Sequence, residues 1–400
     1  MLTDEKKLNL FSKVPEVTIF FWIIKVLCTT VGETFSDFLN VNLGLGLTFT
    51  TVIMGIAFIL VLFLQFKAAK YVPSLYWLTV VLISVFGTLI TDNLTDGIGV
   101  PLETSTILFS ALLGITFLLW YLSEKTLSIH SIYTARREVF YWLTILFTFA
   151  LGTAVGDLFS EQLGLGYLKT GITVVIVIAC IIIAWKYKLN EILAFWIAYI
   201  LTRPLGASLG DYLSQSKKNG GLELGATITS VIFLLAILAI IVFLVVSKID
   251  IVSKSEAVTP NPINAKQKSI GVQTAVVLSL FLLLVIGGYV WCNQYLVPQI
   301  DSSQTTLAGQ VGDFITLEND MLNAVNAKDF ATAKSKANDL EHNWDVSEPK
   351  LRKIDRKTWT QIDGTIDDVL AAVRSKNPDI SKSKSALDES LIILNEANKK

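Results

Sequence analysis

The 400-residue chain has few side chains of the kinds that bind soft metals or form covalent bonds, with three cysteines, three methionines and two histidines. Cys28, Cys180 and Cys292 stand in or at the edge of apolar stretches without a CxxC or other metal spacing, which excludes a disulfide framework. No G-x-S-x-G, Walker, kinase or zinc-protease pattern occurs, and neither histidine has a nucleophile motif beside it. We therefore expect neither an enzyme nor a cofactor.

Long stretches of the chain also lack charge, although the net charge of −1 gives no sign of a nucleic-acid partner. Nine apolar blocks of about twenty residues have the length of a membrane-spanning helix, and spans must be helical because lipid offers backbone groups no partner. The sequence therefore predicts an all-α, multi-pass membrane protein whose main partner is the lipid bilayer. The blocks are residues 15–36, 46–66, 73–92, 102–122, 138–158, 168–186, 191–213, 223–246 and 271–292.

Lysine and arginine alternate between the loops of the first 270 residues. One set of loops carries fourteen of them, whereas the other set holds Lys169, Arg203, Lys217 and Lys218. The first block is too long for a signal peptide and lacks a small-residue cleavage site. By the positive-inside rule, we expect a plasma-membrane protein with a cytoplasmic N-terminus and, after nine spans, an extracytoplasmic C-terminal region.

One skeleton recurs four times, and each copy has a Trp, a Gly ten residues later and an Asp five residues beyond that. The copies are Trp22, Gly32 and Asp37; Trp77, Gly87 and Asp92; Trp142, Gly152 and Asp157; and Trp196, Gly206 and Asp211. Fifteen residues of helix rise about 22 Å, so each Asp should lie near the outer end of its helix. Each copy reads as an outgoing helix, a glycine-containing turn and a returning helix, at about 13–66, 67–125, 126–188 and 189–250. The four copies are therefore parallel repeats.

The rest of the chain differs in character. Residues 251–270 read as a polar cytoplasmic linker, and 271–292 as a ninth span without the repeat skeleton. From Asp301 onward there are 14 Lys or Arg and 17 Asp or Glu, with apolar residues at helical spacing. Breaks near 326–329, 348–349 and 377–378 divide residues 300–400 into about four helices, which predicts a small helical bundle. This bundle is the candidate surface for a protein partner.

The repeats resemble a bacterial membrane-protein family known as a repeat of unknown function, with four tandem two-helix copies and a characteristic Trp. The resemblance covers roughly residues 13 to 247 and rests on three motifs: KVPEVTIFFW at 13–22, GETFSDFL at 32–39, and LGLG at 43–46 and 163–166. The second copy lacks the full LGLG. The resemblance implies the topology and brings no activity.

Four aspartates, Asp37, Asp92, Asp157 and Asp211, occupy one position in four similarly oriented helices. Ionisable groups at membrane depth are candidates for a transport pathway. The alternative is that these carboxylates cap the turns just beyond them, outside the hydrocarbon. A cluster of oxygen ligands favours a hard cation or a proton over a soft metal, although no particular metal is indicated.

Other charged residues accompany the aspartates. Glu33, Asp96, Glu103, Glu161 and Glu223 are expected at the same level. Lys169 is either an internal counter-ion or an outward-reaching lysine. Arg203 either pairs with a repeat aspartate or reaches the outer headgroups, and Lys25 is expected to reach the cytoplasmic surface. Trp22, Trp77, Trp142 and Trp196 form either a pore constriction or, more commonly, packing and interface contacts.

These features favour a transporter or channel for a cation, with the repeat aspartates lining its outer half. The alternative is a membrane-anchored signalling or assembly scaffold that presents the C-terminal bundle to a partner.

Overall fold

The computed structural model describes residues 12–215, 217, 220–251, 267–296, 304–375 and 377–399, and within these ranges all regular secondary structure is helical. Nine of the described helices are long and apolar enough to cross a membrane. Eight form the repeat domain: α2 (Ile19–Asp37), α3 (Leu47–Lys67), α4 (Pro73–Asp92), α5 (Leu102–Glu124), α6 (Ala135–Asp157), α7 (Tyr167–Lys186), α8 (Glu191–Ser214) and α9 (Gly225–Ser247). The ninth is α10 (Gln267–Tyr295), and most of the predicted linker before it lies outside the described residues.

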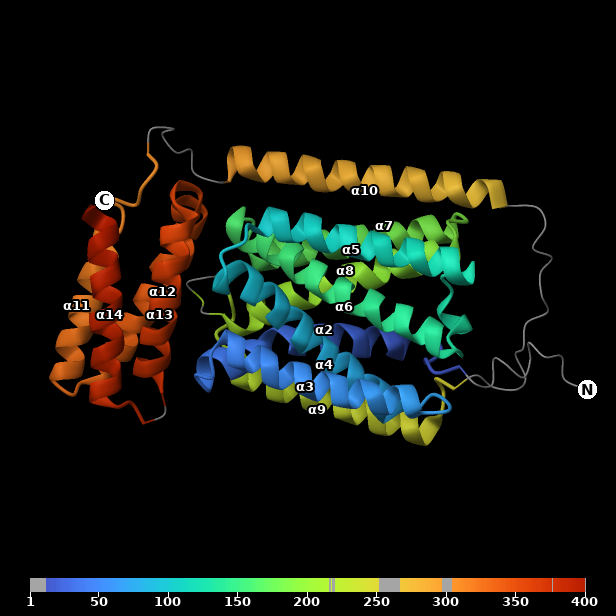
Figure 1. Ribbon diagram of the computed structural model, residues 1–400, viewed down its shortest axis with the longest axis horizontal. Helices are drawn as coiled ribbons and strands as arrows, with labels where there is room; N and C mark the ends of the chain where they lie inside the picture. Colours follow the sequence, from blue (N-terminus) through green and yellow to red (C-terminus); the bar gives the residue numbers. More distant parts are fainter. Residues whose placement is uncertain are drawn as a thin grey trace, which may run out of the picture.

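The first helices of the four repeats form the centre of the membrane domain. Helix α2 packs against α4, α4 against α6, α6 against α8, and α8 against α2, which closes a ring. Each returning helix then packs on the first helix of the next repeat, with α3 on α4, α5 on α6, α7 on α8 and α9 on α2 (Figure 1). The most apolar stretches of the ring helices are 61% buried, against 6 to 28% for the returning helices, which present their apolar faces outward.

The glycine of each repeat permits this ring to close. A Cβ at Gly32 would overlap Ser84, one at Gly87 would overlap Phe149, one at Gly152 would overlap Arg203, and one at Gly206 would overlap Thr29. Each overlapped residue stands seven positions after the Trp of the neighbouring repeat, and the fourth contact returns to the first repeat. Small residues let membrane helices approach closely. The ten-residue offset from Trp to Gly, which is the same in all four repeats, therefore favours a closed ring of four helices.

The turns at the far end of the ring share one geometry in three of the repeats. Directly after Asp37, Asp92 and Asp157 the helix widens into a π-helical turn, named η1 (Phe38–Asn42), η2 (Asn93–Gly97) and η4 (Leu158–Gln162). Gly46 and Gly166 then begin the returning helices with φ of 77° and 80°, a conformation that favours glycine. In the fourth repeat α8 continues past Asp211 to Ser214.

The C-terminal region is a four-helix bundle of α11 (Gly312–Asn326), α12 (Phe330–Ile354), α13 (Arg356–Arg374) and α14 (Ile380–Lys399), with a hydrophobic core of its own. The predicted break at residues 348–349 is wrong, because α12 continues through Pro349 and ends at Ile354. An ion pair between Glu348 and Arg352 spans the proline on the same helix face and joins the turns on either side of it.

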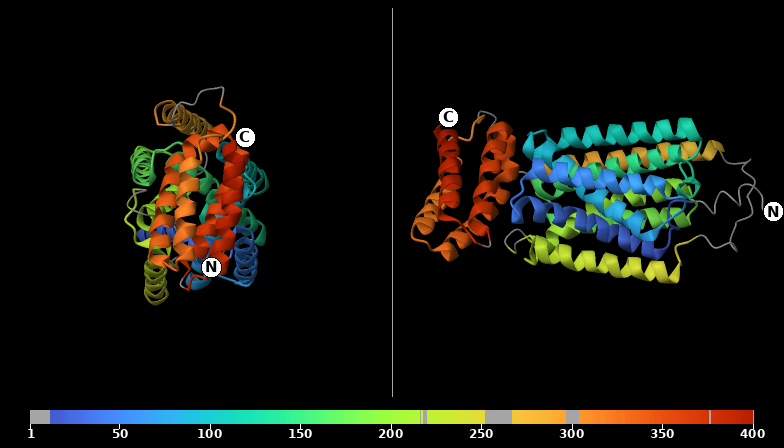
Figure 2. Two further views of the ribbon diagram at one scale, coloured as in Figure 1. Left: turned by 90° about the vertical axis from the view of Figure 1, so that its left-hand side faces the viewer. Right: turned by 60° about the horizontal axis from the view of Figure 1, so that its bottom comes forward.

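The bundle sits across the end of the ring at which the repeat aspartates lie, opposite the end at which α2 begins (Figures 1 and 2). Helix α13 contacts the η1 and η2 turns, and α12 contacts η4. Arg352 pairs with Asp96 across this interface at 3.3 Å. Helix α10 runs along the outside of the repeat domain and returns the chain to this end.

Candidate functional site

The four repeat aspartates lie around the axis of the ring, beneath the bundle. Their charges act on one another in cyclic order, Asp37 with Asp92, Asp92 with Asp157, Asp157 with Asp211, and Asp211 with Asp37. Glu33 is a charged neighbour of all four. The equivalent positions of these carboxylates in the four repeats predict one depth for them, and the structure brings them together there as a ring.

Three of the carboxylates of this ring do not cap the turns that follow them. Asp37, Asp92 and Asp157 each precede a π-helical turn without accepting a side-chain capping bond from it. Across the described residues, no hydrogen bond or ion pair is formed by any of the four side chains. Three of the four are only partly buried, while Asp211 is 6% exposed. The geometry therefore leaves four carboxylates free to bind something that enters the ring.

About one helical turn deeper, Arg203 crosses the axis. Its side chain is fully buried, and Nη2 lies 2.8 Å from Oε2 of Glu33. The same nitrogen donates to Oγ1 of Thr153 at 2.6 Å and to Oγ1 of Thr88. The sequence predicted that Arg203 either pairs with a repeat aspartate or reaches the outer headgroups. Both alternatives are wrong, because Arg203 is buried and pairs with Glu33.

The repeat explains these partners. Glu33, Thr88 and Thr153 each stand eleven residues after the Trp of their own repeat, and Ala207 holds this position in the fourth. Each threonine donates its hydroxyl proton to a carbonyl one turn earlier, at 3.2 Å, so that its oxygen lone pairs face Arg203. Arg203 of the fourth repeat is thus held by side chains at equivalent positions of the other three repeats, and the carboxylate of Glu33 balances its charge.

Lys25 lies on the other side of Arg203 from the aspartates. The expectation that it reaches the cytoplasmic surface is wrong, because it is 1% exposed and its Nζ has no hydrogen-bond partner among the described residues. The ammonium group lies 3.7 Å from the ring centre of Phe149 and 4.1 Å from that of Tyr199. Cation–π contact with these rings replaces the missing hydrogen bonds only in part.

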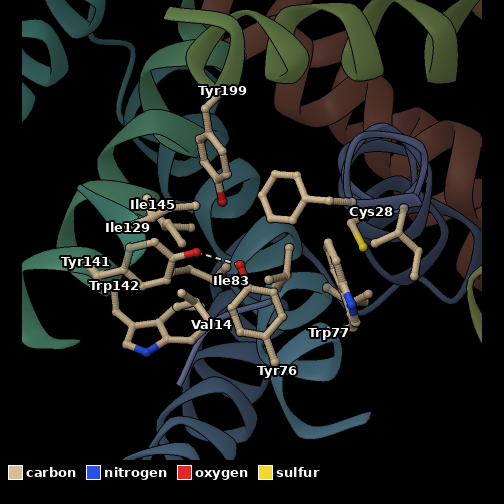
Figure 3. Packing of buried hydrophobic residues seen from close by; sticks show 14 of the residues in the cluster. Val14, Cys28, Tyr76, Trp77, Ile83, Ile129, Tyr141, Trp142, Ile145 and Tyr199 are labelled. Carbon is tan, nitrogen blue, oxygen red and sulfur yellow. Dashed lines mark hydrogen bonds between the residues drawn. The ribbon is translucent and has the colours of Figure 1, made fainter. Parts of the chain in front are cut away.

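Below Lys25 the axis is filled by aromatic side chains (Figure 3). The hydroxyls of Tyr76 and Tyr141 meet at 2.5 Å. Trp77, Trp142 and Trp196 are each at least 96% buried in this layer, and Trp22 is partly buried beside it. The tryptophans thus pack a closed layer at this end of the ring, in agreement with packing as their commoner use.

Of the other predicted residues, Glu161 is a charged neighbour of Asp157 and Asp211, and Asp96 is one of Asp92. Glu103, Glu223 and Lys169 have other surroundings. Glu103 accepts a hydrogen bond from Gln162 and lies 3.6 Å from Arg356 of the bundle. Glu223 is exposed and lies 3.9 Å from Lys217. Lys169 is exposed on α7 and forms no ion pair with the described residues, which fits the outward-reaching alternative.

The bundle adds carboxylates to the space above the ring. Asp363 and Asp367 of α13 face Asp96, and Asp367 is also a charged neighbour of Asp37. Desolvation raises the pKa of Asp363, and it raises the pKa of Asp367 to about 7, with the charges of Asp96 and Glu341 adding to the shift. Within the described ranges, no three His, Cys, Asp or Glu side chains converge closely enough to hold a metal ion. The described carboxylates therefore do not form one compact ligand set.

Sequence reasoning missed Thr88, Thr153 and the role of Lys25. The eleven-residue offset from Trp22 to Glu33, applied to the second and third repeats, leads to these two threonines. Lys25 has no such signal, since its equivalents are Val80, Ile145 and Tyr199.

Comparison with known proteins agrees with the internal repeat. Residues 20–71, 75–126, 140–188 and 194–250 each match the model of a family described as Repeat of Unknown Function (DUF347). These four segments cover the eight helices of the repeat domain and leave out α10 and the bundle. No curated protein and no solved structure matches the chain.

Proposed function

Since the chain belongs to the DUF347 repeat family, whose description assigns no activity, we propose from the geometry that it is a membrane transporter for a cation, either a hard divalent metal ion or a proton-coupled cation. The observation that carries this proposal is the ring of four carboxylates that have no hydrogen-bond or ion-pair partner among the described residues, about one helical turn from the buried pair of Arg203 and Glu33. Oxygen ligands of this kind are those that hard cations prefer.

The buried arginine favours a gated transporter over an open channel. A fixed positive charge on the axis opposes the passage of cations, and the aromatic layer closes the path beyond it. Arg203 acts as a tethered internal cation that neutralises Glu33 while the site is empty. A cation that reaches Glu33 from the aspartate ring competes with the guanidinium, so its binding and the displacement of Arg203 are linked events.

The proposed setting is the plasma membrane, with the N-terminus in the cytoplasm and the bundle outside. The lysine and arginine asymmetry supports this orientation, and the bundle lies at the opposite end of the ring from the start of α2. A reporter fused after Lys248 should be active in the cytoplasm, and one fused after Lys400 should be active outside. The reverse pattern would overturn the orientation.

A scaffold remains a second candidate because the bundle has a separate core and an outward-facing α14, on which Ile392 is 61% exposed. Reconstitution into liposomes separates the two functions. A transporter moves a cation across the membrane when it is the only protein present. A scaffold moves none, and instead a partner is recovered that binds through residues 304–399. Neither proposal requires an enzymatic reaction.

A further inference from the structure

A cavity of about 450 Å³ lies between the repeat domain, α10 and the bundle, away from the axis of the ring. The start of α5, the end of η4, the outer part of α10 and the junction of α12 with α13 form its walls. Its polar lining includes Glu103, Tyr289, Arg352, Lys353 and Arg356. Three cations and one carboxylate therefore face one partly open space.

The cations in this cavity have hydrogen-bond donors without acceptors among the described residues. Arg352 is 4% exposed and pairs with Glu348 and Asp96, yet its Nε has no hydrogen-bond partner within the described chain. Arg356 lies 3.6 Å from Glu103 through Nη2, and its Nη1 is buried and likewise unpartnered.

Lys353 is exposed and forms no ion pair with a described residue. The three cations are equalled in number by Glu348, Asp96 and Glu103. Two guanidinium N–H groups and the ammonium group of Lys353 nevertheless have no partner within the described chain and remain available to a ligand.

The cavity lies at the level where a bilayer has its headgroups. Trp291 and Tyr295 on α10 are 51% and 67% exposed next to the cavity-lining Tyr289. Exposed Trp and Tyr near the end of a spanning helix mark the boundary between lipid and water. The cavity therefore opens where phosphate groups of lipids are abundant.

We propose that this cavity binds a phosphate group, either that of an anionic phospholipid or free inorganic phosphate. Arginine forks match the geometry of phosphate oxygens, and a buried guanidinium without a full set of acceptors is stabilised by such a ligand. The bound phosphate joins α10, α5 and the α12 to α13 junction, and so secures the bundle over the mouth of the ring. This inference is independent of what the axis transports.

The test uses the full-length protein in lipid nanodiscs that contain phosphatidylcholine with or without phosphatidylglycerol, and in detergent with sodium phosphate. Native mass spectrometry measures retained phosphatidylglycerol, and titration calorimetry measures phosphate binding. We expect Lys353→Gln with Arg356→Gln to weaken binding roughly five-fold for each charge removed. Lys357→Gln is the matched control, because Lys357 is exposed beside Arg356 and does not line the cavity.

Retention of phosphatidylglycerol that the double variant loses and the control keeps identifies a lipid site. Binding of sodium phosphate without lipid retention, with the same dependence on the variants, identifies a free-phosphate site and supports the same chemistry. Binding of neither probe, or equal binding by the wild type and the double variant, would overturn the proposal. If the double variant does not fold, the single Lys353→Gln variant tests the same loss at an exposed position.

Discussion

Gly206 in the fourth repeat packs directly against Thr29 in the first, and this contact closes the ring of helices. A Cβ at Gly206 would overlap the Thr29 side chain and lie 2.9 Å from the backbone nitrogen of Thr30. The backbone cannot move aside without separating α2 from α8. The ring therefore depends on a glycine at this point.

Gly206→Ala should lower stability by about 1–3 kcal/mol, because overpacking at a close helix contact forces the helices apart. Gly114→Ala in α5 is the control, since a Cβ there meets nothing within 4 Å. Because Gly114→Ala replaces a glycine inside a helix, it should leave the stability unchanged or raise it by up to about 1 kcal/mol. Thermal unfolding in detergent compares the two, and equal midpoints would contradict the closed ring.

The pair of Arg203 and Glu33 should be strongly coupled in stability. Removing one partner leaves an uncompensated buried charge and costs about 3–5 kcal/mol, so both Arg203→Gln and Glu33→Gln should lower the unfolding midpoint. The double variant should cost less than the sum of the two.

Lys336→Gln is the control for this cycle, since its pair with Asp320 is at the surface and should contribute little to stability. Additive effects of Arg203→Gln and Glu33→Gln would show that the two side chains do not interact on the axis.

The depth of the aspartates follows from the sequence, whereas the partner of Arg203 and the place of Lys25 do not. The fixed offset from Trp to Asp placed four carboxylates at one depth, because equivalent positions in parallel repeats share a level. It did not identify the partner of Arg203, since that depends on the order of the repeats around the ring. Lys25 was misplaced because a lysine near a helix start usually reaches water, whereas here the neighbouring helices enclose it. The cavity at Arg352 and Arg356 forms only where the bundle docks on the repeat domain. No local sequence pattern predicts this docking.

The stability of the bundle should fall as pH rises, owing to Glu318. Burial raises the pKa of Glu318 to about 8, although Ser390 donates a hydrogen bond to its Oε1 at 2.7 Å. From about pH 4.5 to 8 the folded state therefore holds a proton that the unfolded state has lost. The favourable contribution is complete below this range and is lost through it.

Glu318→Gln keeps the hydrogen bond but cannot ionise. It should flatten the pH profile and be more stable than the wild type at pH 8, by on the order of 2–4 kcal/mol. Glu389→Gln removes a carboxylate from the exposed face of α14 and serves as the control. Unfolding midpoints of the full chain between pH 5 and 8 give the comparison. A wild-type bundle that grows more stable with rising pH would exclude this role for Glu318.

Docking of the bundle over the ring should also weaken as pH rises through 7. Desolvation is the largest cause of the raised pKa of Asp363 and Asp367, and the charge of Asp96 across the interface raises both pKa values further. A released bundle loses the contribution of Asp96, so the docked state binds protons more tightly. Fluorescent labels at Ile98→Cys and Gln361→Cys, in a Cys180→Ser background, should lie closer together at pH 5 than at pH 8. A variant with Asp363→Asn and Asp367→Asn should show no such change, and a pH-independent distance in the wild type would contradict the prediction.

The central claim is that the aspartate ring binds the transported cation, and flux into proteoliposomes tests it most directly. The purified protein is reconstituted alone, and uptake of protons and of divalent ions such as Mg²⁺ and Mn²⁺ is measured for Asp37→Asn, Asp92→Asn, Asp157→Asn and Asp211→Asn. Glu223→Gln is the control, because it removes a carboxylate from the exposed turn at the same end of the ring. We predict that the wild type and the control move a cation. Each aspartate variant should lose at least about ten-fold in rate, since a removed charge weakens binding in a partly desolvated ring, while its unfolding midpoint stays near that of the wild type. Wild-type protein that moves none of these ions, or variants that keep full flux per folded molecule, would contradict the account.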